Sequence, residues 1–188
     1  MGTRRRERGA VAVEAALVTP MFILLIVGII EFGMFFKDYL SVSSAVRAGV
    51  RTASAEPRMS TYAQDAADSV AAEGTVFNRG QVQELWVYKA NPTDVWPAGN
   101  TNITKFASCT TCVKFTWNGT KFAPTYSNWN AVDQNACAQT ATTAPDRVGV
   151  YMKVRHTAFT KFVFSSITIE ENAVLRFEPK PQTQTCKP

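Results

Sequence analysis

The feature that most constrains the fold of this chain is a long apolar run near its N-terminus. Residues 10–36 are apolar apart from Glu14, Thr19 and Glu31. A helix over this run would be about 40 Å long, enough to cross a hydrocarbon core of about 30 Å. Pro20 lies inside the run, and we expect it to kink the helix or to be satisfied locally. The run predicts a single transmembrane helix anchored in a lipid bilayer.

Basic residues precede this run and set its expected direction. Residues 1–9 hold four of the 20 Lys and Arg and one of the 15 Asp and Glu. The net charge of +5 therefore belongs mostly to the N-terminus, and the remainder implies no particular partner. Because positive charge stays inside, we expect the N-terminus in the cytoplasm and the C-terminal region outside the cytoplasmic membrane.

A secretory signal peptide is the competing interpretation of the apolar run. Such a peptide has a short apolar region that leads directly into a small-residue cleavage site. Here the run is longer, and the nearest such site, residues 53–55, comes only after several charged side chains. We therefore interpret the run as an anchor.

The border between the basic leader and the apolar run carries the most specific pattern. Gly9 is the last leader residue, and Glu14 is the fifth residue after it. Glycine allows a peptidase to approach the backbone closely, which favours cleavage between Gly9 and Ala10. The new amino group of Ala10 would be mostly protonated and would suit Glu14 of a neighbouring subunit. Such a head-to-tail contact builds open helical assemblies.

A simpler interpretation of the two glutamates remains open. Glu14 and Glu31 are separated by about 26 Å along a helix, so both would lie near opposite membrane surfaces. Glu14 would then be answered by a leader arginine and would need no neighbouring subunit.

This opening has the arrangement of type IV prepilins and most resembles TadE-like proteins. The resemblance covers about the first 55 residues, with Ala15 standing where that family often has an aromatic residue. The residues that match the family pattern are Arg8, Gly9, Val13, Glu14, Pro20, Glu31, Phe32 and Gly33.

The resemblance implies a minor pilin or pseudopilin of a tight-adherence (Tad, type IVc-like) pilus, present in the membrane or in a surface pilus. It also implies three kinds of protein partner, namely a prepilin peptidase, other pilin subunits and the pilus assembly platform. The alternative is an uncleaved single-pass anchor that presents an extracytoplasmic binding domain.

Beyond the membrane the pattern predicts two helices. Val42, Val46, Val50 and Ala53 recur at helical spacing, and Pro57 ends the pattern. Residues 60–73 are expected to form a short second helix that stops at Gly74. We therefore divide the chain into a leader (1–9), a transmembrane helix (10–36), its continuation (37–56) and an extracytoplasmic α+β domain (57–188).

Four or five strands are expected in that domain. Alternating apolar residues indicate strands at 81–90, 113–117, 148–155 and 165–177, and Asn118-Gly119 is a strong hairpin signal followed by residues 120–122. Segments 91–104 and 123–146 are expected to be loops, and the tail 179–188 to be extended. The expected fold class is α+β and pilin-like, with a long helix, a short helix and an antiparallel sheet.

The cysteines favour structural disulfides. All four follow the apolar run, which suits an oxidising compartment: Cys109, Cys112, Cys137 and Cys186. The CxxC at 109–112 would also suit a redox enzyme or half a zinc site, but a strand pattern follows it where a redox motif opens a helix. Any of the three possible pairings remains open.

The remaining candidates for chemistry give no active site. His156, the single histidine, is expected to be a surface or sheet residue. Glu170 and Glu171 are adjacent in a strand and point to opposite faces. Basic and aromatic residues interleave over 114–122, but a half-solvated sheet face explains this without nucleic acid. We expect no enzyme, cofactor, metal or nucleic-acid partner.

Overall fold

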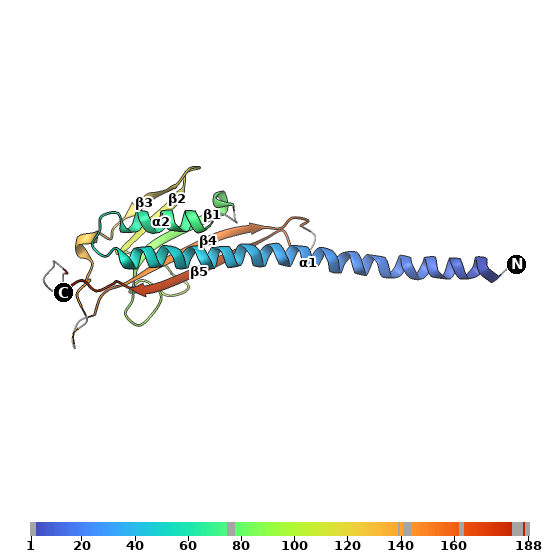
Figure 1. The fold of residues 1–188 in the computed structure, drawn as a ribbon, viewed down its shortest axis with the longest axis horizontal. Coiled ribbons are helices and arrows are strands. Elements are labelled where there is room, and N and C mark those ends of the chain that lie inside the picture. The colour runs from blue at the N-terminus through green and yellow to red at the C-terminus, as the bar shows by residue number, and fades with distance from the viewer. Residues whose placement is uncertain are drawn as a thin grey trace.

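The computed structural model describes residues 3–74, 78–138, 140, 144–161, 164–181 and 186, with side chains from Gly9 onward. Two helices are followed by a five-stranded sheet (Figure 1). The helices are α1 (Thr3–Ala55) and α2 (Tyr62–Glu73), with short 3-10 turns η1 (Arg79–Gln81) and η2 (Ala131–Asp133). The strands are β1 (Val82–Ala90), β2 (Cys112–Trp117), β3 (Phe122–Ser127), β4 (Arg147–Thr157) and β5 (Ser166–Arg176).

Helix α1 dominates the shape of the molecule. Its 53 residues span about 80 Å, and the helix continues through Pro20. Figure 1 shows its C-terminal half lying on the sheet and its N-terminal half projecting alone. The predicted stripe is buried at Val42, Val46, Val50 and Ala53. The predicted second helix is confirmed as α2, which ends at Glu73 with Gly74 as its C-cap.

The sheet is antiparallel throughout and has the order β3-β2-β1-β4-β5. Helices α1 and α2 pack together on one face, α1 over β4 and β5 and α2 over β3 and β1. The main hydrophobic core lies between these layers, where alternate residues of β4 such as Val150 and Met152 are fully buried. The expected α+β class is confirmed.

Strand β3 corrects the prediction that residues 123–146 form a loop. Pro124 lies inside this strand and pairs with Phe115 next to a register shift. Because β3 is an edge strand, the missing N–H of proline costs no ladder bond in the middle of the sheet. The predicted hairpin is confirmed, with Gly119 at φ 100° and Asn118 Oδ1 accepting hydrogen bonds in the turn.

The second face of the sheet corrects the expectation of a solvated surface. Residues 91–111 fold over it, and a separate cluster of buried side chains forms beneath them. Phe106 stacks on Trp86 at 4.6 Å and contacts Tyr88 and Tyr151 edge-on or tilted. Residues 91–111 shield these large aromatic side chains from water. The second face of the sheet is therefore buried in part and not fully solvated.

Candidate functional site

The N-terminal half of α1 is an exposed apolar helix. Gly9, Ala10 and Glu14 are all exposed, and Val13 is 61% exposed. The helix over residues 9–55 contains an 18-residue apolar window, none of it buried, and is long enough to cross a membrane. Among the described side chains no ion pair involves Glu14. The leader arginines that were its simpler candidate partners lie outside the described side chains.

Glu31 has a quite different environment from Glu14. Its side chain is fully buried beneath the turn between β4 and β5. The backbone N–H of Phe159 donates to Oε2 at 3.1 Å, while the N–H and hydroxyl of Thr160 both donate to Oε1 at 2.5 Å. A carboxylate with three donors is well satisfied away from water. Glu31 therefore ties α1 to a turn that is 128 residues distant in the sequence.

The other residues of the sequence motif are divided between this junction and the free surface. Phe32 contacts Phe164 of the β4–β5 turn edge-on at 6.1 Å. Pro20 and Gly33 face outward, and a Cβ added to Gly33 would meet no atom within 4 Å. The structure thus brings Glu31 and Phe32 to one contact, while Gly9, Ala10 and Glu14 stay together at the other end of the run.

His156 is a buried sheet residue, in agreement with the prediction. It lies in β4, and its Nδ1 is 2.7 Å from Oδ2 of Asp38 on α1. The Phe35 ring contacts the imidazole edge-on at 5.7 Å. Sequence reasoning missed this pair, although Glu31, Phe35 and Asp38 share one helix face with Val42 by their spacing. The buried stripe of α1 therefore begins inside the apolar run.

The adjacent glutamates of β5 point to opposite faces, as predicted. Glu171 faces α1, where its hydrogen bond and charge raise the pKa of the Tyr39 hydroxyl. Glu170 faces the covering segment and pairs with Lys105 and, at 3.4 Å, with Lys153. The hydrogen bond and charge of Lys105 lower the pKa of the Glu170 carboxyl, with Lys153 adding to the effect. These contacts tie β5 to the elements on both sides of the sheet.

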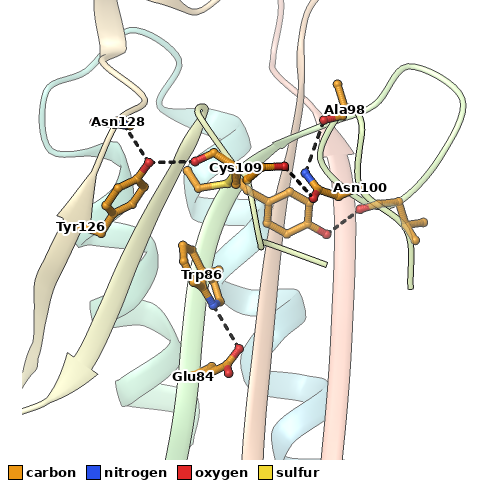
Figure 2. Close-up of a disulfide and its surroundings, with 11 residues drawn as sticks. Glu84, Trp86, Ala98, Asn100, Cys109, Tyr126 and Asn128 are labelled. Atoms are coloured by element: carbon orange, nitrogen blue, oxygen red, sulfur yellow. Dashed lines mark hydrogen bonds between the residues drawn. A yellow bond between two sulfur atoms is a disulfide. The ribbon is translucent and has the colours of Figure 1, made fainter. Parts of the chain in front are cut away.

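The cysteines form two disulfides, Cys109–Cys112 and Cys137–Cys186. The first closes the covering segment at the start of β2, and no helix follows it (Figure 2). Tyr126 donates its hydroxyl to the carbonyl of Cys109 at 2.8 Å. Beside them lies an open cavity of about 480 Å³. Its lining includes Trp86, Phe106, Lys114 and Tyr126. Among the described residues, no three His, Cys, Asp or Glu side chains gather as metal ligands would.

A long helix with a free apolar half and a half packed on an antiparallel sheet defines a membrane-anchored, pilin-like architecture. Residues 9–51, less than a quarter of the chain, match the family model described as TadE-like protein. The resemblance to TadE-like proteins that the opening of the sequence carries is therefore supported over this segment. No curated protein and no solved structure matches the chain significantly.

Proposed function

We propose that this chain is a minor pilin or pseudopilin of a Tad-type pilus, with a structural and not an enzymatic role. The observation that carries the proposal is the division of α1. Its first half offers a largely apolar surface to lipid or to neighbouring helices, and its second half is built into the folded domain. The match of residues 9–51 to the TadE-like model supports the same conclusion.

Processing is the first step of the proposed function. A prepilin peptidase cleaves between Gly9 and Ala10, and Ala10 becomes the first residue of the subunit. The support is steric as well as sequence-based, because Gly9 and Ala10 are exposed and a Cβ at Gly9 would meet no atom within 4 Å. No packing in the described chain shields this bond from an enzyme.

Assembly is the second step, and Glu14 is its proposed contact. A carboxylate within the membrane is unfavourable by a few kcal/mol and is normally tied to a partner. Glu31 has such partners inside its own chain, whereas Glu14 is exposed. We assign the Ala10 amine of a neighbouring subunit to Glu14, which sets the axial register of the filament.

The proposed location follows from the direction of insertion. The leader lies in the cytoplasm, residues 10–36 span the cytoplasmic membrane, and the disulfide-bearing domain lies outside. The partners are the lipid bilayer, the prepilin peptidase, other pilin subunits and the assembly platform.

The experiment compares Glu14→Ala with Val13→Ala, a neighbouring exposed position, in cells that make the pilus. Both variants should be cleaved, because neither changes Gly9 or Ala10. Only Glu14→Ala should be lost from sheared pilus fractions, since it alone removes the proposed charge pair. Normal incorporation of Glu14→Ala would show that the pair is not needed.

The alternative function is an uncleaved anchor that presents a binding domain. The cavity beside the Cys109–Cys112 disulfide favours it, because Lys114 lies over the Trp86 ring at 5.1 Å in a lining rich in aromatic residues. This alternative predicts that the mature protein keeps its arginine leader and that Lys114→Ala removes ligand binding without changing pilus assembly.

A further inference from the structure

The turn that joins β4 to β5 lies beside the membrane segment of α1. Strand β1 pairs with β4 only as far as Val154, so the end of β4, the start of β5 and their turn project beyond the other strands. Figure 1 shows this projection running along α1 toward the N-terminus. Ala158 N–H donates to the carbonyl of Ser165 at 3.1 Å and closes the turn. The hairpin is thus the part of the sheet nearest to the apolar half of α1.

The hydrogen bonds of Glu31 fix the height of this turn along α1. If residues 10–30 of the proposed 10–36 span fill the hydrocarbon core of about 30 Å, Glu31 lies at its outer boundary and residues 31–36 lie in the interface. The backbone N–H groups of Phe159 and Thr160 lie against that carboxylate. Thr160 also lines an apolar cavity of about 450 Å³ on α1, whose other lining residues are Pro20, Ile23, Leu24 and Val27. The turn therefore reaches the level of the last turns of the membrane span.

The side chains at the turn suit a membrane surface better than water. Phe159 is 76% exposed and so presents its apolar ring outside the folded domain. Lys161 beside it is exposed as well. A phenylalanine ring can enter the apolar side of a membrane interface, while a lysine two residues further on extends its ammonium group to the headgroups. The backbone polar groups that face Glu31 are satisfied, as a segment at this depth requires.

We propose that residues 158–161, at the start of the β4–β5 turn, form a second membrane contact, in which Phe159 inserts into the outer interface of the bilayer beside α1. This inference rests on the proposed membrane span of α1. With two contacts the tilt of the folded domain relative to the membrane plane is restricted. The single helix alone fixes the height of the domain but leaves its tilt free.

Tryptophan fluorescence in lipid nanodiscs that hold one copy of the full chain tests this proposal. Three variants are compared with the unmodified chain in lipids brominated near the headgroup or near the end of the acyl chain. Phe159→Trp probes the turn, and Ile26→Trp, at an exposed position of α1, marks the membrane core. Val132→Trp, 65% exposed in η2 beside Arg58 at the other end of the domain, is the water-exposed control.

The proposal predicts that most of the fluorescence added by Phe159→Trp is lost in lipids brominated near the headgroup, and less in the other lipid. Ile26→Trp should be quenched in both lipids and Val132→Trp in neither. If Ile26→Trp is quenched while Phe159→Trp behaves like Val132→Trp, the turn does not touch lipid and faces water or another subunit, although the anchor stands. If Ile26→Trp is not quenched, the membrane span fails and this inference fails with it.

Discussion

At Glu31 a carboxylate inside an apolar helix is satisfied by donors from a distant turn. This contact gives the glutamate a function within its own chain, and Glu14, 17 positions earlier, has no such arrangement among the described residues. Two acids in one apolar run therefore have two different environments. The proposed roles follow from this difference. Glu31 holds α1 to the sheet within one chain, and Glu14 contacts a neighbouring subunit.

The Glu31→Gln variant tests the contact between Glu31 and the β4–β5 turn. The amide oxygen can still accept from Thr160, but the amide nitrogen would face the N–H of Phe159, donor against donor. We expect faster hydrogen exchange of the turn amides at 158–161, measured by mass spectrometry on the full chain in detergent micelles. Glu14→Gln, which changes an exposed carboxylate, should leave this exchange unchanged. Equal protection of the turn in both variants would contradict the account.

Glu170 gives a prediction on pH. Its pairing with Lys105 and Lys153 lowers the pKa of the carboxyl below its ordinary value of 4.5. The unfolded chain therefore binds the proton first as the pH falls, so the pair stabilises the fold above about pH 4.5 and loses this effect as the pH falls through the lower, folded-state pKa. Because the pair is partly exposed, its contribution is at most about 1 kcal/mol.

The Glu170→Gln variant should show this loss directly. We expect a slightly lower thermal midpoint than the unmodified chain near neutral pH and a smaller difference at pH below the folded-state pKa. Glu171→Gln, on the other face of the same strand, is the matched control. A Glu170→Gln difference that stays constant with pH would exclude the ion pair as its cause.

At the scale of elements, the two helices depend on a close approach at Gly49. A Cβ added there would lie 2.6 Å from Cγ2 of Val70 and 3.0 Å from the backbone oxygen of Ala66. The helix backbone of α2 cannot give way as a flexible side chain would. Gly49 is therefore the position at which α1 and α2 pack most tightly among the described glycines of α1.

Gly49→Ala should lower the free energy of unfolding by about 1–3 kcal/mol through overpacking. Gly33→Ala, on the same helix with no atom within 4 Å, should leave it unchanged or slightly higher because alanine favours helix. Denaturant titration of the full chain in micelles measures both values. If the free energy of unfolding of Gly49→Ala equals that of Gly33→Ala, the two helices can move apart at this position without loss of stability, and the account of their packing is wrong.

The elements differ in how far the sequence predicts them. The helix spacing and the alternation in β4 are strong periodic signals, and both are confirmed. The sequence predicts the hairpin into β3 but indicates a loop at residues 123–127, because Pro124 and several polar residues make this exposed edge strand look irregular. The packing of residues 91–111 on the second face of the sheet was missed because their apolar residues have no regular spacing. Their packing depends on single aromatic side chains such as Phe106.

The candidate site was predictable only in part for a related reason. The positions of Gly9, Ala10 and Glu14 follow from local sequence, since they lie within one turn or two of the same helix. The partners of Glu31 and of Asp38 come from the β4–β5 hairpin, more than 100 residues away. Such contacts depend on strand register and tertiary packing, which local patterns do not determine.

At the scale of the whole molecule, the chain has one part suited to lipid and one part suited to water. The free half of α1 buries its apolar surface only in lipid or against other helices, and the folded domain has its own core and two disulfides. The Glu31 and Asp38 contacts join the parts at their boundary. This division is what a subunit needs if it is stored in a membrane and then added to a filament.

The intact mass of the protein purified from native membranes tests the central proposal most directly. The account predicts a mature chain that begins at Ala10, because a prepilin peptidase removes residues 1–9. Both disulfides should be present in the same measurement. A chain that still carries its four leader arginines would contradict the pilin assignment and would leave a plain membrane anchor.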